Sequence, residues 1–384
     1  MKFFISILMI FNLAFAKDFL VKDMRGVEVK IAEPLTKIAT IDDGFVEGVM
    51  THLGVIDKVK VIGSWSMKRD YKYSFTRRSG ESYTLRGWNT MKYLHPWLDE
   101  LTCINSPQGN VINFENLANE NPQLVILRVG DCTLRGSNKD AVEKTISTIE
   151  ALGLPLVVIY APQGAEISTM KEEMRVLGDV FNQRQKALKL FEYLDGTQKL
   201  IEERTAKLKE SEKVSMLYMG LNPNVRKNGG MATAYGVNTP ESFIIQNVAG
   251  AKNAFTGDGT NVILSTEQLY AIDPDVIVLP TSNGYHPVSE LLDSPDFEKL
   301  GELKAVQNKR VYAMPWSPMN CARRVEYPID MLIIAKAAYP KLFSDIKVHE
   351  FVLKFYQEVY GVDDATAKAL RSEQILDWTV EDDF

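Results

Sequence analysis

Residues 182–209 lie near the middle of the 384-residue chain, and they contain no proline and a single glycine, Gly196. Apolar residues recur in this segment near helical spacing, with lysine, arginine and glutamate between them: Leu188, Phe191, Leu194, Leu200 and Ile201. A continuous helix of this length would be ~42 Å long at 1.5 Å per residue. One interpretation is an ordinary surface helix that breaks at Gly196. The midway position favours the other, a strut that joins two lobes.

On both sides of this segment, short apolar strands alternate with amphipathic helices, a pattern typical of α/β folds with parallel sheets. The strands predicted before it are 37–41, 59–63, 124–128 and 156–160, and the helices are 44–53, 114–119 and 140–152. The strands predicted after it are 214–219, 276–279 and 310–313, with an apolar helix at 329–338. Two further helix starts are predicted from Thr239-Pro240 and from the capping box that begins at Ser265. We therefore expect two α/β halves.

The first 16 residues resemble a secretory signal peptide. Lys2 precedes an almost wholly apolar run, and Ala14-Phe15-Ala16 is an A-x-A cleavage pattern. The run is shorter than the ~20 residues that span a bilayer, no later apolar run approaches that length, and no lipobox cysteine follows. We expect export to a Gram-negative periplasm. The predicted segments are 1–16 (signal peptide), 17–181 (N-terminal lobe), 182–209 (linking helix), 210–345 (C-terminal lobe) and 346–384 (C-terminal helical extension).

Composition and motifs exclude several classes of function. The net charge is -6, which argues against a nucleic-acid-binding protein because such a protein carries a basic excess. The sequence lacks G-x-S-x-G, a P-loop, a dinucleotide-binding G-x-G-x-x-G and H-E-x-x-H, and its four histidines are scattered. We therefore expect a protein that is not an enzyme. A two-lobed metal-cofactor enzyme remains as an alternative, and a secreted adhesion or scaffold module as a third.

The three cysteines do not have zinc-site spacing. In an oxidising compartment Cys103 and Cys132 could pair, which would leave Cys321 free.

Residues 64–111 are rich in aromatic and arginine side chains and have poor periodicity. They include Trp65, Tyr71, Tyr73, Phe75, Tyr83, Trp88, Tyr93 and Trp97, with Arg69, Arg77, Arg78 and Arg86. Long irregular segments inside compact domains tend to be binding loops or lids. The alternative is a locally packed aromatic core.

Several motifs, in order, resemble periplasmic substrate-binding proteins for iron chelates, haem and vitamin B12. Residues 21–31, Pro34 and 37–40 are similar to the opening hairpin and first strand of that family. Residues 113–117 and 121–126 resemble its N-x-E-x-L…P-D-L-V-I run, with Gln123 in place of the usual acidic residue. Segments 152–158, 265–269, 273–277, 305–312 and 335–340 complete the resemblance. It covers about residues 20 to 345, and the chain continues beyond it.

The resemblance implies two Rossmann-like lobes with mostly parallel central sheets, joined by one long helix, with the ligand in the cleft between them. It implies small hinge motion. The cargo would be a metal chelate, most plausibly a ferric siderophore with Fe3+, and no intrinsic cofactor. The chain, a monomer that does not itself span the membrane, would deliver the chelate to an inner-membrane ABC permease with its ATPase. A nickel or cobalt chelate, haem, a corrinoid or a molybdate-type oxyanion would suit the same architecture.

Candidate ligand-binding residues of the second lobe follow its predicted strands, where open α/β sheets bind ligands. Arginine suits the anionic oxygens of a siderophore because it stays charged and offers several donors. Arg323 or Arg324 could instead form a surface ion pair with Glu326. The candidates are Tyr218, Tyr285, His286, Trp316, Arg323, Arg324 and Tyr327. Trp316 and Tyr327 flank the loop that carries the arginines and could stack on the planar groups of a chelate. His286 could complete a metal's coordination through the chelate, or it could be a hydrogen-bonding surface residue.

The first lobe would contribute residues of the aromatic segment and of the end of its first strand. These candidates are Arg77, Arg78, Arg86 and Trp88, with the backbone of Asp42, Asp43 and Gly44 close to the ligand. In the resembled family, one acidic residue on each lobe docks on permease arginines, and Glu115 and Glu241 lie at or near those positions. Both also lie in the first turn of a predicted helix, where a carboxylate is favourable for the helix itself.

Overall fold

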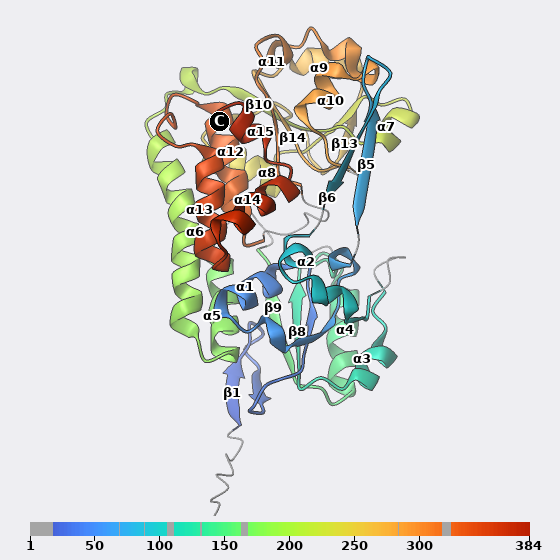
Figure 1. Cartoon of the computed structure of the whole chain (residues 1–384), viewed down its shortest axis with the longest axis vertical. Helices are drawn as coiled ribbons and strands as arrows, with labels where there is room; N and C mark the ends of the chain where they lie inside the picture. Colours follow the sequence, from blue (N-terminus) through green and yellow to red (C-terminus); the bar gives the residue numbers. More distant parts are fainter. Residues whose placement is uncertain are drawn as a thin grey trace, which may run out of the picture.

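The computed structural model describes residues 18–68, 70–87, 89–105, 111–130, 133–162, 168–282, 284–316 and 324–384. The predicted signal peptide, Trp88, Cys132, Cys321 and Arg323 lie outside these residues. The chain forms two α/β lobes stacked along its longest axis, with one long helix beside both (Figure 1). Among the described residues, none of the helices combines the length and the apolar character that crossing a membrane requires.

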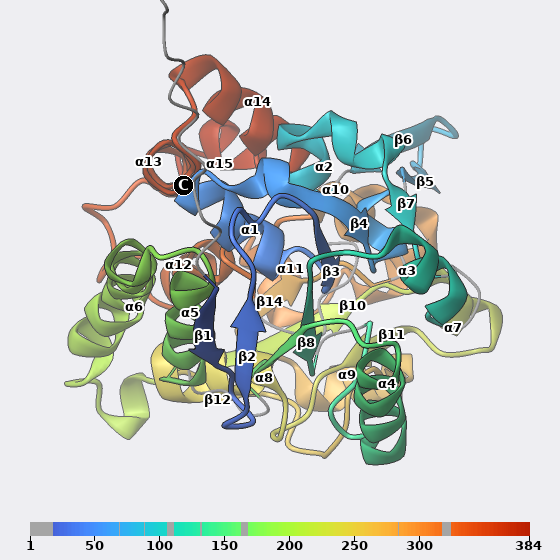
Figure 2. The same ribbon diagram turned by 90° about the horizontal axis from the view of Figure 1, so that it is seen from below.

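The N-terminal lobe is built on a five-stranded sheet in which every pair is parallel. Its order is β7-β4-β3-β8-β9, with bounds Thr102–Cys103, Val59–Ile62, Ile38–Ile41, Leu124–Val129 and Leu156–Tyr160. All residues of β8 are buried, as expected for a strand covered on both faces. Helices α5 and α6 lie to one side of β3 and β8, and α3 and α4 to the other (Figure 2). The bounds of α1, α3, α4 and α5 are Phe45–Leu53, Phe114–Glu120, Lys139–Ala151 and Ser168–Val180.

Helix α6 (Arg184–Thr205) is the strut of the molecule. Its 22 residues make a rod of about 33 Å, and it continues through Gly196 without a break. It contacts α1 and α5 of one lobe, and the π-helix Ile244–Val248 and α12 (Tyr327–Ala338) of the other. The prediction of a strut inside residues 182–209 is therefore confirmed, and the prediction of a break at Gly196 is wrong.

The C-terminal lobe has a mixed sheet. Its core, β10 (Ser215–Gly220), β14 (Val276–Leu279) and β15 (Val311–Ala313), is parallel and matches the three predicted strands closely. The short β11 (Ala232–Ala234) and β13 (Val262–Leu264) extend it antiparallel, and β12 (Lys252–Asn253) pairs with β10. The helices are α7 (Pro223–Lys227), α8 (Pro240–Phe243), α9 (Thr266–Ile272), α10 (Val288–Asp293) and α11 (Lys304–Gln307). Thr239 and Ser265 cap α8 and α9, as predicted.

The C-terminal extension forms α13 (Val348–Tyr360), α14 (Asp364–Glu373) and α15 (Trp378–Glu381) and packs on both lobes. His52 of α1 approaches the carbonyl oxygen of Val359, with Nδ1 2.8 Å away. On the other lobe, Tyr285 donates its hydroxyl to the carbonyl oxygen of Ile375 at 2.9 Å. The extension is therefore a second bridge between the lobes, and it buries its aromatic face inside this chain.

Two further hairpins complete the chain. The first, β1 (Phe19–Lys22) with β2 (Glu28–Ile31), matches the opening hairpin expected from the resemblance. The second, β5 (Tyr71–Thr76) with β6 (Ser82–Gly87), belongs to the aromatic segment and is followed by α2 (Thr90–Leu94). This second hairpin rises from the N-terminal lobe along the C-terminal lobe (Figure 1). It is an ordered antiparallel element, whereas an irregular loop was expected.

Candidate functional site

The carboxyl ends of the N-terminal strands are tied together by one buried carboxylate. Asp43, which follows β3, accepts hydrogen bonds from Ser64 after β4 (Oγ, 2.9 Å) and Thr133 after β8 (Oγ1, 2.8 Å). The adjacent Asp42 accepts from the backbone N–H of Gly44 and Val46, at 2.9 and 2.8 Å, where α1 begins. Both aspartates were expected near the ligand through their backbone, and their side chains are turned inward to hold the strand ends in place.

A fully buried charged cluster lies behind this edge. The guanidinium of Arg128 on β8 pairs with Glu173 of α5, and its Nη1 is 3.6 Å from Oδ1 of Asp42. Burial raises the pKa of Glu173 to about 7 although Arg128 opposes the shift. Burial, with the negative charge of Asp42, also raises the pKa of Glu47 on α1 well above its usual value. One guanidinium thus pairs with two carboxyl groups, Glu173 and Asp42, and the raised pKa values of Glu173 and Glu47 favour their protonated forms.

The corresponding region of the C-terminal lobe combines tyrosines and carboxyl groups. Tyr218 of β10 is buried and meets the ring of Tyr235 edge-on, with the ring centroids 5.1 Å apart. Burial raises the pKa of Tyr218 well above its usual value, and the charges of Glu241 and Asp330 add to the shift. Burial also raises the pKa of Asp330, on α12, to about 7, against the attraction of Arg324. This group of residues is an electrostatically coupled site at the start of α12.

Arg324 and Tyr327 flank this group. Arg324 is half-buried, and its charge acts on Asp330, Tyr356 and Tyr360. Tyr327 is buried at the first position of α12. Of the expected C-terminal candidates, the structure therefore brings Tyr218, Arg324 and Tyr327 into one neighbourhood.

His286 has a different place from the one predicted. Its side chain is buried, with Nδ1 2.7 Å from Oε2 of Glu290 and Nε2 2.9 Å from the carbonyl oxygen of Ser282. Both ring nitrogens are therefore engaged by groups of the protein, and neither is open to a metal. The structure thus disfavours His286 as a metal ligand. No group of three or more histidine, cysteine or acidic side chains that could hold a metal ion occurs among the residues that the structure describes.

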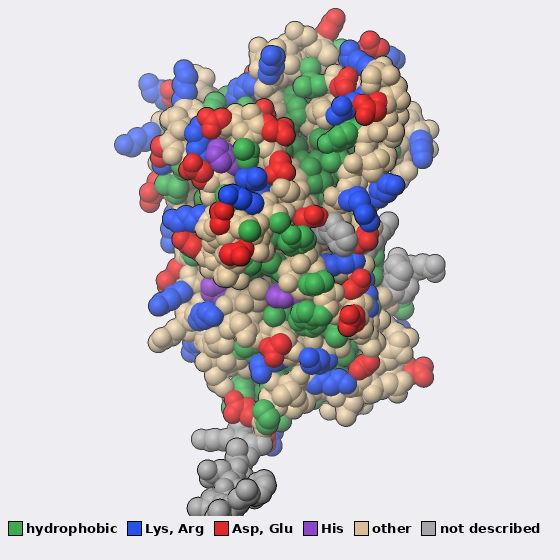
Figure 3. Space-filling view, viewed as in Figure 1, with side chains coloured by type: hydrophobic (Ala, Val, Ile, Leu, Met, Phe, Trp, Pro, Cys, Tyr) green, Lys and Arg blue, Asp and Glu red, His purple; other side chains and the backbone are tan. Residues whose placement is uncertain are grey.

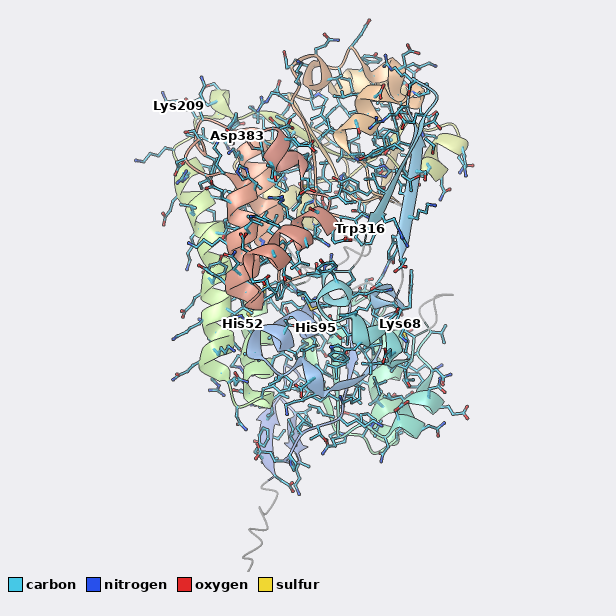
Figure 4. All side chains as sticks on the ribbon, viewed as in Figure 1. His52, Lys68, His95, Lys209, Trp316 and Asp383 are labelled. Atoms are coloured by element: carbon cyan, nitrogen blue, oxygen red, sulfur yellow. The ribbon has the colours of Figure 1, made fainter. Side chains whose placement is uncertain are left out.

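Trp316 and Tyr285 are also packed against protein. Trp316 is 2% exposed and meets Tyr71 of the hairpin edge-on at 4.8 Å. Tyr285 is 1% exposed, and its hydroxyl is bound to the C-terminal extension. Figure 4 shows Trp316 at the boundary between the lobes. The expectation that Trp316 stacks on a chelate disagrees with its placement, because the hairpin and the extension cover it. Tyr285, expected among the ligand-binding residues, is covered in the same way.

Arg77, Arg78 and Arg86 of the aromatic segment lie on the hairpin, and Arg69 is outside the described residues. Arg77 covers the ring of Tyr83 at 4.5 Å and approaches Asp293 of α10 at 3.9 Å. Arg78 is exposed next to it, and Arg86 is exposed with Asp70 3.7 Å away. Arg77 and Arg78 thus lie at the far end of the hairpin, against the C-terminal lobe. Arg77 and Arg78 were expected to bind the ligand from the N-terminal lobe. This expectation needs correction, because both residues lie beside Asp293 of the C-terminal lobe, away from the edge of the N-terminal sheet.

The two expected docking carboxylates differ in exposure. Glu115 is exposed in the first turn of α3, which Asn113 caps. Glu241 lies in the first turn of α8, half-buried and with Oε2 fully covered. Its charge acts on Tyr218 and Tyr235, so its side chain belongs electrostatically to the C-terminal site.

Cys103 is a free thiol, and its Sγ lies 3.4 Å from the carbonyl oxygen of Asn105. The pairing expected with Cys132 involves a residue outside the described ranges.

A pocket of about 930 Å³ lies at the turn between α5 and α6 beside β1. Lys22, Arg175, Asp179 and Lys186 are among its lining residues. The elements that line it, β1 and the adjoining ends of α5 and α6, lie at the end of the N-terminal lobe away from the C-terminal lobe (Figure 1). In the space-filling view, hydrophobic side chains gather instead on the upper lobe beside the hairpin (Figure 3).

Sequence reasoning did not identify Asp330, Tyr235 or the Arg128–Glu173 pair as site residues. A signal was present in two of these cases. Asp330 is the single acidic residue at the start of an apolar helix, and Arg128 is the single charge in an apolar strand. A lone charge in an otherwise apolar element is costly unless it is paired, and for this reason marks a built site.

Comparison with known proteins finds periplasmic binding proteins by sequence and by structure. A family described as "Periplasmic binding protein" matches residues 85–318. The high-affinity heme uptake system protein IsdE of Staphylococcus aureus (strain MRSA252) is 28% identical over 163 residues, which are 41% of this chain and 52% of IsdE. The chain thus spans about half the length of the curated relatives it matches.

Solved structures match over much more of the chain. A periplasmic solute binding protein from Veillonella parvula DSM 2008 has a TM-score of 0.72 at 20% identity, over 96% of this chain and 100% of that one. The molybdate-bound MolA of Haemophilus influenzae has a TM-score of 0.63 at 18% identity, over 90% of this chain and 99% of its own. At these identities the likeness establishes the two-lobed fold.

Proposed function

Since this chain belongs to the periplasmic binding protein family, we propose that it captures a metal chelate between its lobes and delivers it to an inner-membrane ABC permease. The observation that carries the proposal is α6, which joins two α/β lobes, each with a parallel core of strands, and contacts both. Polar groups at the strand ends of both lobes supply donors and acceptors, and ligands of open α/β sheets bind at such ends. The segment 1–16, as a signal peptide, would place the protein in the periplasm.

A ferric siderophore is the first candidate for the cargo. Arg324 and the hydroxyls of the C-terminal site offer hydrogen-bond donors to anionic chelating oxygens. Haem is the second candidate, since the relative IsdE is named for heme uptake. A molybdate-type oxyanion is the third, since MolA binds molybdate. Nickel or cobalt chelates and corrinoids complete the set of cargoes to be tested.

The test is a fluorescence titration of the purified mature protein. The probes are a ferric catecholate, a ferric hydroxamate, haemin, cobalamin, nickel with histidine, and molybdate. Saturable quenching by a ferric chelate supports the first candidate, and saturation by another probe alone rejects it. Replacing Arg324→Gln is expected to weaken binding of an anionic chelate by roughly ten- to a hundredfold, since a charge-assisted hydrogen bond is worth about 1.5–3 kcal/mol. Arg175→Gln, on α5 far from the lobe boundary, is the matched control and should bind normally.

A further inference from the structure

The hairpin β5–β6 connects the two lobes through an apolar cluster of its own. The cluster consists of Tyr285, Ala313 and Trp316 of the C-terminal lobe, all at most 2% exposed, with Tyr71 and Leu85 of the hairpin packed against them. Ile375 of the C-terminal extension packs on the same cluster. By sequence the hairpin belongs to the N-terminal lobe, but its inward face is part of the core of the other lobe.

A hydrogen-bonded latch lies next to this cluster. Tyr73 of β5 donates its hydroxyl to Oε1 of Glu290 at 2.5 Å, and Oε2 of Glu290 accepts from His286 at 2.7 Å. The ring of Tyr73 also meets the imidazole of His286 edge-on, 4.9 Å between centroids. Arg226 of α7 lies 3.9 Å from the same carboxylate. Glu290 is fully buried, so removing Tyr73 would leave one of its oxygens without this donor.

Glycines on both sides allow the close fit. A Cβ atom on Gly284 of the C-terminal lobe would lie 2.3 Å from the ring of Tyr73. A Cβ atom on Gly87 of the hairpin would likewise lie 2.3 Å from the ring of Trp316. Such distances are impossible between non-bonded atoms, so each ring depends on a glycine in the facing segment. At the tip, the backbone N–H of Arg78 donates to the carbonyl oxygen of Asp293 at 2.7 Å.

The C-terminal extension strengthens the connection from the other side. It is bound to α1 through His52 and Val359, and to the C-terminal lobe through Trp316, whose backbone N–H donates to Gln374 at 3.0 Å. Among the described residues, α6, the hairpin and the extension therefore each bridge the two lobes. Two of them, the hairpin and the extension, meet at Trp316.

We propose that the β5–β6 hairpin is a fixed interlobe strap, seated in the C-terminal lobe by Tyr71 and Tyr73, which with the extension holds the ligand-free lobes at one separation. An isolated two-stranded hairpin is marginally stable in water. The strap therefore keeps its own structure only while it is seated. The strap is independent of which ligand the protein binds, so it can be tested without any ligand.

The test compares wild type with Tyr73→Ala and Gly284→Ala in the full mature chain. Hydrogen exchange of hairpin amides and acrylamide quenching of Trp316, isolated by difference from Trp316→Phe, report on seating. Both variants are expected to increase hairpin exchange at least tenfold and to raise the quenching of Trp316. Thr84→Ala, on the opposite face of the hairpin, is the control and should change neither. If Tyr73→Ala does not fold, Tyr73→Phe replaces it in the comparison. This variant keeps the ring and loses only the hydroxyl, so increases in exchange and quenching that are smaller than those of Gly284→Ala are expected.

Small-angle scattering of the same ligand-free samples measures lobe separation. The radius of gyration should increase in the two strap variants and stay constant in Thr84→Ala. The proposal is overturned if the unseating variants leave exchange and quenching at wild-type levels. It is also overturned if the hairpin unseats while the radius of gyration is unchanged, because the hairpin would then not restrain the lobes. Neither outcome depends on the titrations above.

Discussion

Arg128 and Glu173 form an ion pair that is entirely buried behind the carboxyl edge of the N-terminal sheet, with Nε 2.7 Å from Oε1 and Nη2 3.2 Å from Oε2. The guanidinium also covers the ring of Phe45, 4.0 Å from its centroid. These contacts join β8, α5 and α1. The pair therefore fixes the relative positions of the elements that carry Asp42 and Asp43, at the edge where the ligand is proposed to bind.

The first prediction concerns the loss of the cation. Replacing Arg128→Met leaves two buried carboxyl groups, Glu173 and Asp42, without their guanidinium, which should lower the free energy of unfolding by about 3–5 kcal/mol. Urea unfolding followed by circular dichroism at neutral pH measures it. The control is Arg175→Met, since Arg175 pairs with Glu172 at the surface and its loss should cost less than about 1 kcal/mol. Equal effects of the two changes would show that the buried cluster is not specially stabilising.

The second prediction concerns pH. The folded protein holds the pKa of Glu173 at about 7, above its ordinary value of 4.5. Between these pH values the folded state binds more protons than the unfolded state, so the free energy of unfolding falls as pH rises through this window. Glu173→Gln should flatten that fall, by on the order of 1–3 kcal/mol across the window at about 1.4 kcal/mol per pKa unit. Urea midpoints from pH 4.5 to 8 measure the slope.

The neighbouring Glu172→Gln is the control for this measurement. The hydrogen bond from Arg175 lowers the pKa of Glu172, so its titration lies below the window and the slope should not change. A wild-type slope in Glu173→Gln would mean that another group, such as Glu47, carries the whole effect.

The strands and helices were largely predictable because each follows a local pattern. Leu156–Tyr160 and Val276–Leu279 are uninterrupted apolar runs, and sequence predicted both with their observed bounds. Thr239 and Ser265 marked their helices because capping depends on residues within one turn. Strands such as Ala232–Ala234 are too short for any period to appear, so they were missed.

The site was less predictable because its pairs are distant in sequence. Nothing local in Tyr73 indicates Glu290, which is 217 residues away, and nothing in Trp316 indicates the hairpin that covers it. For this reason Trp316, which follows a strand end, was predicted to face the ligand, whereas it packs against the hairpin. Tyr218 and Tyr327 were selected by the same reasoning, and they do lie beside Asp330 and Arg324.

The third prediction concerns Asp330 and the charge of the cargo. Its pKa of about 7 means that it gains a negative charge as pH rises through neutrality. An anionic chelate held near Arg324 should therefore bind more tightly at pH 6 than at pH 8. Asp330→Asn should remove most of this pH dependence and tighten binding at pH 8 by roughly five- to tenfold, as expected for one like charge at moderate distance. Titration at both pH values measures it.

The matched control for Asp330 is Asp364→Asn, in the first turn of α14 and exposed to solvent. A chelate whose affinity does not change with pH in the wild type would contradict either the anionic character of the cargo or its position beside Asp330. A cationic probe such as hydrated Ni2+ without histidine distinguishes the two, because its affinity should change in the opposite direction if it binds beside Asp330.

The last prediction separates docking from binding. Glu115 is exposed on α3, so Glu115→Lys should leave chelate affinity within about twofold and strongly reduce uptake if this carboxylate docks on the permease. Glu241 has a covered oxygen beside Tyr218 and Tyr235, so Glu241→Lys should weaken chelate binding itself. Uptake of a labelled chelate by cells, alongside titration of each purified variant, measures both. Glu143→Lys, exposed on α4, is the control and should do neither. If Glu115→Lys supports wild-type uptake, Glu115 is not a docking residue. If Glu241→Lys binds the chelate with normal affinity, Glu241 does not belong to the binding site, and docking on the permease again becomes its expected role.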